Sequence, residues 1–287
     1  MLYMELARTI ESVRKSISAA RAQDKSIGFV PTMGALHAGH VALIEEAVKS
    51  CDFVVASIFV NPTQFAPGED LERYPRDLEG DMKICEEAGV DLVFAPGASE
   101  MYHKANITWV SVEKLTENLC GRSRPGHFRG VATVCAKLFN IVSPDVAFFG
   151  QKDAQQAIVI KRMAGDLNMP LQIVVCPTVR EQDGLAVSSR NQYLSAAQRK
   201  DAVLLSAALR ECEKLVAGGQ RNCEVLIETM RKFISQSSKA QIEYVSIVDT
   251  ETLADIDVIK GNALVALSAK IGSTRLIDNI FVGLDKQ

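Results

Sequence analysis

Short apolar runs alternate with amphipathic stretches between about residues 27 and 176 of the chain. The runs are rich in Val, Ile and Phe and are bounded by polar residues or by Gly and Pro, as buried strands of a parallel sheet are. Five runs fit this description: Ile27–Pro31, Phe53–Val60, Asp91–Ala95, Val146–Phe149 and Leu171–Cys176.

Helical spacing fills the intervals between these strands. Apolar side chains from His40 to Val48 recur at i, i+3, i+4, i+7 and i+8, which predicts a helix entered at about Gly39. Further helices are expected over Leu78–Ala88, Val131–Val142 and Ala154–Leu167, with Asp77 and Asp153 as candidate N-caps of the first and the last. Strands that alternate with helices predict an α/β fold with a Rossmann-like, doubly wound parallel sheet.

The rhythm changes after about residue 180. Ser195 and Gln198 have the spacing of a capping box and precede a long helix, which Ala217–Gly219 interrupts before a second helix over Glu224–Ile234. Three strands are expected after it: Glu243–Val248, Ala263–Ala269 and Thr274–Val282. We therefore expect a larger nucleotide-binding domain over residues 1–178 and a smaller α+β domain over residues 179–287 that closes over the active site.

Composition and charge narrow the class of protein. The 287 residues carry 32 Lys and Arg against 35 Asp and Glu, a net charge of −3, so no nucleic-acid partner is expected from overall charge. No apolar run approaches the roughly 18 residues of a membrane span, and Glu5, Arg8 and Glu11 interrupt any signal-peptide core. The 7 cysteines form no CxxC pair. A cytoplasmic protein with reduced thiols and no membrane partner is expected.

The segment from Gly28 to His40 holds the strongest chemical signal. It leaves the first strand through Pro31 and Gly34 and enters a helix with two histidines, His37 and His40, three residues apart. Open α/β sheets bind ligands at the carboxyl ends of their strands, where a helix N-terminus and imidazole donors suit a phosphate. Structural roles compete with this: His37 as a helix cap and His40 as a half-buried helix residue. No third ligand supports a metal site, and no GxxxxGK[ST] or GxGxxG motif is present.

A second polar cluster follows the strand that ends near Phe149. Gly150 permits a tight turn, and Lys152 carries a point charge suited to phosphate. Asp153 either caps the next helix or accepts a hydrogen bond from a ribose hydroxyl. Gln156 lies one turn into that helix, where an amide can hold a small polar substrate.

Two more clusters lie where strands or domains end. Ser188, Ser189 and Arg190 follow a Gly-containing loop and suit a mobile phosphate clamp, although Ser-Ser-Arg by itself is common. Asn61 and Gln64 follow the second strand as neutral amides that either form a turn or orient a substrate. The fold brings the carboxyl ends of the strands to one edge of the sheet, where all four polar clusters would meet. It is therefore improbable that each cluster has a separate, purely structural role.

These motifs closely resemble those of the pantothenate synthetases, the pantoate–β-alanine ligase family. The resemblance rests on Pro31-Thr-Met-Gly-Ala-Leu-His-Ala-Gly-His40, Phe59-Val-Asn-Pro-Thr-Gln-Phe65, Phe149-Gly-Gln-Lys-Asp153 and Ser188-Ser-Arg-Asn191, and it runs from about residue 25 to Ile280. The resemblance implies that pantoate attacks the α-phosphorus of ATP to give an enzyme-bound pantoyl adenylate and pyrophosphate. The amine of β-alanine then attacks the acyl carbon, which releases pantothenate and AMP.

The resemblance also assigns roles residue by residue, together with Mg²⁺ on the ATP phosphates, no protein metal ligands, and a homodimer. Catalytic roles fall to His40, His37, Lys152, Ser188, Ser189 and Arg190. Pantoate and β-alanine would be held by Gln64, Gln156 and Asn61. ATP would be bound by Met33, Gly34, Ala35, Leu36, His37, Ala38, Gly39, His40, Gly150, Gln151, Lys152, Asp153, Val179, Val187, Ser188, Ser189 and Arg190.

Several positions and alternatives stay open at this stage. Thr63, Gln151 and Val187 differ from residues frequent in the family, so their side-chain roles are not assigned; Tyr74, Arg124 and His127 fit a scaffold role as well as a site role. An adenylyl- or cytidylyltransferase acting on a phosphorylated small molecule is the alternative enzyme, although it would need more cationic side chains than the two glutamines provide. A catalytically silent nucleotide-binding protein is the alternative outside enzymes.

Overall fold

The computed structural model describes residues 4–103 and 106–283. The chain divides into two compact units, and each is described by itself. The first consists of Met1–Val112, Arg124–Gln151 and Val159–Pro177; the second consists of Glu113–Ser123, Lys152–Ile158 and Thr178–Gln287. The chain therefore passes from one unit to the other five times, so neither unit is a single stretch of sequence.

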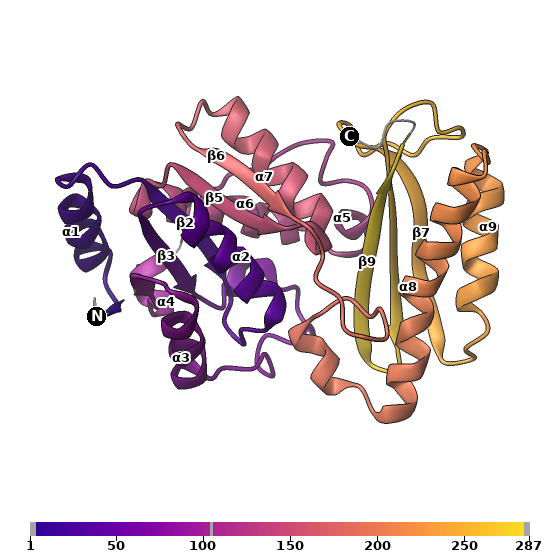
Figure 1. Ribbon diagram of the computed structural model, residues 1–287, viewed down its shortest axis with the longest axis horizontal. Helices are drawn as coiled ribbons and strands as arrows, with labels where there is room; N and C mark the ends of the chain where they lie inside the picture. Colours follow the sequence, from indigo (N-terminus) through magenta and orange to yellow (C-terminus); the bar gives the residue numbers. More distant parts are fainter. Residues whose placement is uncertain (1–3, 104–105, 284–287) are drawn as a thin grey trace. The chain divides into compact units, whose positions relative to one another are not determined.

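A six-stranded, wholly parallel sheet forms the centre of the first unit (Figure 1). Its strands, in the spatial order β1-β4-β3-β2-β5-β6, are β1 (Glu5–Ala7), β4 (Leu92–Phe94), β3 (Phe53–Ile58), β2 (Ile27–Thr32), β5 (Val146–Gly150) and β6 (Gln172–Cys176). From β2 the chain winds first through β3 and β4 on one side and then through β5 and β6 on the other. Such a reversal of winding direction places a crevice at the carboxyl ends of β2 and β5.

Helices cover both faces of this sheet, because successive strand residues point to opposite sides. On one side Val30, Val54 and Phe148 pack with Ile44 and Ala47 of a helix that follows β2. On the other side Phe29 and Phe149 make edge-to-face contacts with Phe139, at 6.4 Å between ring centroids. The helices of this unit are α1 (Ile10–Arg21), α2 (Ala38–Ser50), α3 (Leu78–Ala88), α4 (Ala98–Met101) and α6 (His127–Val142), with the 3-10 turn η1 (Pro62–Gln64). The 3-10 turn η2 (Gln151–Asp153) and helix α7 (Ala154–Asp166) each contain residues of both units.

The second unit packs two helices on an antiparallel sheet of three strands. The sheet has the order β7-β8-β9, and Leu205, Leu209 and Leu226 of the helices pack with Val265 and other residues of the strands. Ser195 and Gln198 form the capping box that the sequence predicts. The elements are β7 (Ala240–Asp249), β8 (Ala263–Ile271), β9 (Thr274–Val282), α5 (Cys120–Ser123), η3 (Ser189–Tyr193), α8 (Ala196–Ala217) and α9 (Cys223–Ile234).

The observed fold confirms the expected class: a parallel α/β sheet with a smaller, separate antiparallel sheet. Predicted strands and helices agree with the structure within a few residues at each end, and Asp77 caps α3 as expected. The expectations omit β1 and α1, although Val13, Ile17 and Ala20 of α1 have helical spacing and are buried. All 7 cysteines are free thiols.

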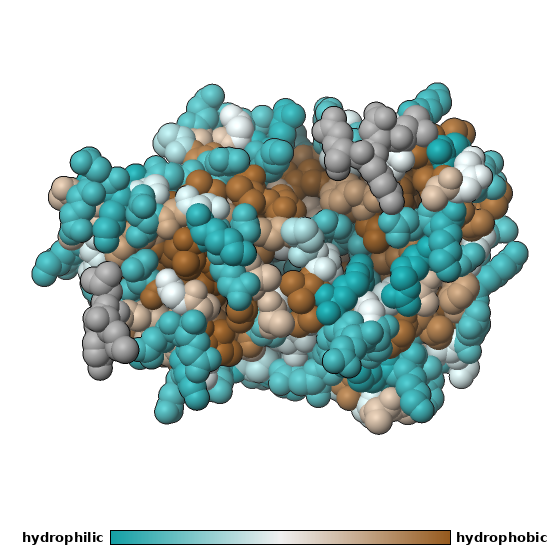
Figure 2. Space-filling view, viewed as in Figure 1, coloured by the Kyte–Doolittle hydropathy of each residue, from teal (hydrophilic) through white to brown (hydrophobic). Residues whose placement is uncertain are grey.

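Polar side chains cover much of the face shown in Figure 2, with apolar patches between them. Among the described residues, no helix is both long enough and apolar enough to cross a membrane.

Candidate active site

The segment between β2 and α2 makes a tight left-handed turn. Gly34 has φ +81° and Ala35 has φ +51°, so two successive residues adopt a conformation that L side chains rarely take. His37 then caps α2, because its Nδ1 accepts a hydrogen bond from the backbone N–H of Gly39 at 3.2 Å. The backbone thus turns sharply and presents the start of a helix at the carboxyl end of β2.

The two histidines stack on one another at this helix start. Their ring centroids lie 4.0 Å apart with an interplanar angle of 20°. Since Nδ1 of His37 accepts a hydrogen bond, its Nε2 carries the proton and acts as a donor. A Cβ atom at Gly39 would lie 3.0 Å from Cε1 of His37, so a side chain there would displace the ring. The capping role considered for His37 is thus observed.

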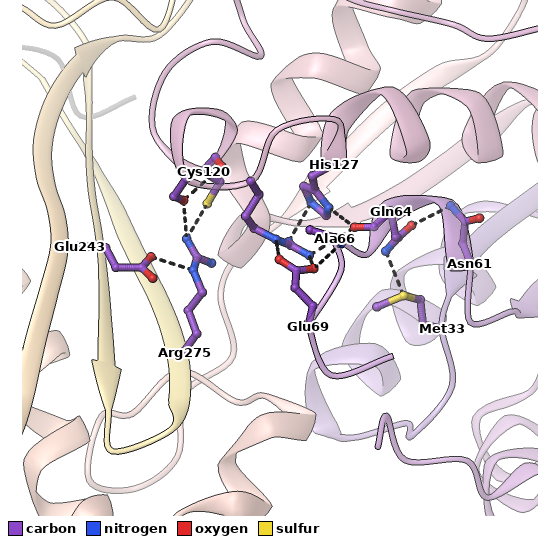
Figure 3. A network of polar contacts seen from close by, with 11 residues as sticks. Met33, Asn61, Gln64, Ala66, Glu69, Cys120, His127, Glu243 and Arg275 are labelled. Atoms are coloured by element: carbon purple, nitrogen blue, oxygen red, sulfur yellow. Dashed lines mark hydrogen bonds and ion pairs between the residues drawn. The ribbon is translucent and has the colours of Figure 1, made fainter. Parts of the chain in front are cut away.

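Two amides after β3 lie against the same turn, as Figure 3 shows. Asn61 donates through Nδ2 to Oε1 of Gln64 at 3.1 Å and to the carbonyl oxygen of Gly130 at 3.2 Å. Nε2 of Gln64 in turn donates to Sδ of Met33 at 2.9 Å. Met33 belongs to the turn that leads to the histidines, so the turn and Gln64 are in direct contact. Both amides are buried: Asn61 is 1% exposed and Gln64 is 8% exposed.

Asn61 uses its amide for contacts inside the protein. Its Oδ1 accepts hydrogen bonds from Oγ1 of Thr63 at 2.9 Å and from the hydroxyl of Tyr102 at 2.9 Å. These donors fix the orientation of the Asn61 amide and, through it, that of Gln64. Thr63 therefore does have a side-chain role here, which is to hold Asn61.

Behind Gln64, an ion pair and a histidine hold its backbone (Figure 3). Arg124 binds both carboxylate oxygens of Glu69, at 2.7 and 2.6 Å. It also faces Nε2 of His127 at 3.0 Å, and Nδ1 of His127 lies 2.8 Å from the carbonyl oxygen of Gln64. Since arginine only donates and a carbonyl only accepts, the tautomer of His127 with its proton on Nδ1 satisfies both contacts. We name Glu69, Arg124 and His127 the anchor triad.

The charges of the anchor triad are matched. Burial by itself would raise the pKa of Glu69, but hydrogen bonds and charge from Arg124 lower that pKa below its ordinary value. Glu69 also accepts a hydrogen bond from the backbone N–H of Ala66 at 3.2 Å. Tyr74, the third of the open positions, is buried edge-to-face against Phe65 at 6.0 Å.

The second polar cluster, Gly150–Asp153, lies at the end of β5, the strand beside β2. β5 pairs with β2 in parallel through Phe29 and Ala147, and it ends at Gly150. Gly150 and Gln151 belong to the first unit, and Lys152 begins a segment of the second. In that segment Nζ of Lys152 lies 3.8 Å from the Asp153 carboxylate.

Adjacent glutamines of α7 have different environments. Gln155 is buried and holds the segment Glu113–Ser123, because its amide bonds the carbonyls of Leu115 and Asn118 and the N–H of Cys120. Gln156, half-buried, takes no part in those bonds. The amide of Gln155 is therefore committed to this segment, and the expected ligand-binding role of Gln156 stays a prediction.

The third cluster forms a hairpin in the second unit. The N–H of Val187 donates to the carbonyl of Val179 at 3.0 Å, which sets these two positions side by side. Arg180 pairs with the buried carboxylate of Asp278 at 2.7 Å. Ser188 caps η3 by accepting a hydrogen bond from the N–H of Arg190 at 3.3 Å. The Ser-Ser-Arg segment thus begins a 3-10 turn at the end of an anchored hairpin.

The structure gathers the expected residues in two groups. The first unit brings together Met33, His37, His40, Asn61 and Gln64 and places Gly150 at the neighbouring strand end; the second unit holds Lys152, Asp153, Gln156, Val179, Val187 and Ser188–Arg190. Sequence reasoning missed Glu69 and Asp81. The sequence does mark Asp81, because its position three residues after Leu78 and four before Cys85 places it on the apolar face of the predicted helix. The structure buries it there, with 3% of its surface exposed.

Comparison with known proteins identifies the family. A family model described as pantoate-beta-alanine ligase matches residues 5–281. The chain belongs to the pantoate–β-alanine ligase family. Members of this family are ATP-dependent ligases, so the expected family and class of enzyme are confirmed.

Curated relatives and solved structures agree with this family over nearly the whole chain. The pantothenate synthetase of Pelotomaculum thermopropionicum is 54% identical over 98% of this chain and 99% of its own, and that of Moorella thermoacetica is 55% identical over 96% and 98%. A pantothenate synthetase structure from Thermus thermophilus matches with a TM-score of 0.92 at 45% identity, covering 96% of this chain and 99% of that one. A Francisella tularensis pantoate–β-alanine ligase complexed with β,γ-ATP and β-alanine matches at 0.81 and 34%, covering 97% of each.

Proposed function

We propose that this ligase condenses (R)-pantoate with β-alanine in two steps at the residues described above. The pantoate carboxylate attacks the α-phosphorus of ATP, which expels pyrophosphate and leaves pantoyl adenylate on the enzyme. The β-alanine amine then attacks the acyl carbon, which forms the amide of pantothenate and expels AMP. Activation is needed because a carboxylate is a poor electrophile, whereas its mixed anhydride with AMP is a good one.

The observation that carries this proposal is the contact between Met33 and Gln64. It joins the turn that bears His37 and His40 to an oriented amide, at 2.9 Å from nitrogen to sulfur. A nucleotide at the helix start and a carboxylic acid at the amide would therefore be neighbours, as an in-line attack requires. The imidazole donors would stabilise the charge that develops on the α-phosphate oxygens.

The residues proposed to bind pantoate, Gln64 and Gln156, are uncharged, which favours a ligase over the alternative transferase. Gln64 and Gln156 would bind the hydroxyl groups of pantoate, and Asn61 would act by orienting Gln64. A transferase that acts on a phosphorylated acceptor would need cationic side chains at this place. Arg124, which donates to the backbone carbonyl of Gln64, is already bonded to both oxygens of Glu69.

The remaining expected residues would bind the nucleotide phosphates and ribose. Lys152 and Arg190 supply positive charge, while Ser188 and Ser189 supply hydroxyl donors. These donors are cations and neutral groups and not a set of carboxylates. We therefore propose that Mg²⁺ is held mainly by the ATP phosphates and water, the ligands it favours, with no cage of protein ligands.

We also propose that the protein works in the cytoplasm as a homodimer, with residues 179–287 closing over the nucleotide. Seven free cysteines suit a reducing compartment. The dimer rests on the family resemblance, and sedimentation equilibrium of the purified protein tests it.

Isotope exchange between pyrophosphate and ATP tests the activity. With Mg²⁺ present, exchange should require D-pantoate, and AMP and pantothenate should appear only when β-alanine is added. A transferase would keep the nucleotide in its product and release no AMP on addition of the amine. Absence of pantoate-dependent exchange by folded protein would overturn the proposed reaction.

A further inference from the structure

A buried carboxylate on α3 reaches the turn that leads to the histidines. Oδ2 of Asp81 accepts a hydrogen bond from the backbone N–H of Ala35 at 3.0 Å, and Oδ1 accepts one from the N–H of Leu36 at 2.7 Å. Asp81 is 3% exposed. The two oxygens thus bind successive backbone donors 45 and 46 residues away in the sequence.

The backbone at this place is one that the chain does not adopt readily. Ala35 has φ +51°, a left-handed conformation that is unfavourable for a residue with a Cβ. Gly34 allows the carboxylate to approach, since a Cβ there would lie 2.8 Å from Oδ2 of Asp81. Something other than local preference must therefore keep residues 34–36 in this shape.

Packing supports one side of the turn only in part. A pocket of about 340 Å³ lies in the first unit, lined by residues that include Met33, Gly34, Asp81 and Phe59. This pocket is open to solvent, so the protein contacts on that side of the turn are incomplete. The hydrogen bonds of Asp81 hold Ala35 and Leu36, while the N–H of Gly34 donates to Oγ1 of Thr32 at 3.1 Å.

We propose that Asp81 is a positioning residue that fixes the shape of the turn formed by Met33–His40, and so sets the position of the two imidazole donors at the start of α2. This inference rests on the proposed function, in which that turn binds ATP. Burial raises the pKa of Asp81, although its two backbone donors act in the opposite direction. Because the ionised carboxylate is less favourable when buried, keeping Asp81 here lowers the stability of the folded protein. Such a cost is expected for a residue that is retained because it shapes a functional site.

The variants Asp81→Asn and Asp81→Ala test the proposal. Asparagine keeps the volume but turns an NH₂ group toward one of the backbone donors, whereas alanine removes both acceptors. We expect kcat/KM for ATP to fall about 10- to 100-fold, the size of losing one or two hydrogen bonds to a charged group, while KM for β-alanine stays within about twofold. Cys85→Ala is the matched control, because it loosens the packing of the same helix at a buried residue without touching the turn.

Hydrogen exchange of the protein without substrates gives a readout that does not depend on activity. In both Asp81 variants the amides of residues 33–37 should exchange about tenfold faster or more, while Cys85→Ala leaves them as in the wild type. Unchanged exchange in that peptide, or unchanged use of ATP by folded Asp81→Asn protein, would overturn the inference. If the wild-type protein showed no pantoate-dependent exchange of pyrophosphate, the proposed function would fail, and the amide measurement would still decide the role of Asp81.

Discussion

Two imidazole rings at the start of α2 stack at 4.0 Å, close enough that a positive charge on both would be strongly repulsive. His37 is fixed as a cap of α2 through its Nδ1. His40 lies one turn further along and is the residue we expect to stabilise the reacting phosphate.

Replacing His40 with alanine should slow adenylate formation by about 10²–10³-fold, the scale of losing one donor to a transition state. The rate is measured as pyrophosphate released in a single turnover with pantoate and ATP. His103→Ala serves as the control because that histidine is exposed and outside the site. Adenylate formation at the wild-type rate in His40→Ala would contradict this role.

Lys152→Ala should abolish most turnover, since the positive charge that would bind the phosphates of the nucleotide is lost. KM for ATP should rise together with a fall in kcat. Lys161→Ala removes an exposed lysine further along α7 and should leave both constants unchanged. Equal turnover in the two variants would rule out a phosphate-binding role for Lys152.

At the scale of elements, the anchor triad ties the loop after η1 to the start of α6. The pKa of Glu69 is lowered in the folded protein by Arg124, in spite of its burial. A carboxyl group with a lowered folded pKa stabilises the protein above its unfolded pKa, about 4.3 for Glu, and loses that contribution as the pH falls through the folded value. The tie between η1 and α6 is thus strongest near neutral pH.

Glu69→Gln should lower the free energy of unfolding at pH 7 by on the order of 1–3 kcal/mol, because Arg124 is left without its charged partner. The difference from wild type should shrink as the pH falls below the unfolded pKa and through the lowered folded pKa of Glu69, where the carboxylate becomes protonated. Urea denaturation at several pH values measures it, with the exposed Glu72→Gln as control. A difference independent of pH would show that the charge of Glu69 is not the cause.

The KM for pantoate should also rise in Glu69→Gln, since the anchor triad holds the backbone of Gln64.

Periodicity in the sequence predicts most of these elements, because a buried strand or helix face needs apolar side chains at a fixed spacing. It also predicts the turn with His37 and His40, since strand ends of a parallel sheet converge. Glu69 and Asp81 lie beyond such reasoning. Each binds backbone groups or side chains tens of residues away, and nothing local distinguishes them from solvent-exposed acids except the apolar face on which Asp81 lies. Asn61 is predicted as a site residue, but its commitment to Gln64 is a matter of tertiary contact.

At the scale of the whole molecule, the cysteines are structural. Burial raises the pKa of Cys85, Cys135 and Cys212 to about 12, with nearby acidic groups adding to the effect at Cys85 and Cys212. Thiolates react and thiols do not, so these groups are inert in the folded protein. Cys51 is the half-exposed member of the set.

A thiol-specific disulfide reagent at pH 8 should therefore react with one thiol of the native protein and with all seven after denaturation. Cys51→Ser should remove the early reaction, whereas Cys212→Ser should not. Absorbance of the released thiolate measures both phases. Early reaction of two or more thiols in native protein would mean that the buried cysteines become accessible.

The five passages of the chain between its two units bear on how the protein is made. The segment Glu113–Ser123 emerges from the ribosome early, but Asn118 bonds the carbonyl of Leu253, 135 residues later, and Cys120 and Ser123 await Arg275. Translation at roughly 5–20 residues per second makes that interval several seconds or more. During this time the polar groups of Asn118, Cys120 and Ser123 lack these partners. The growing chain thus carries an unfinished segment through most of its synthesis, and only the last strand, β9, completes it.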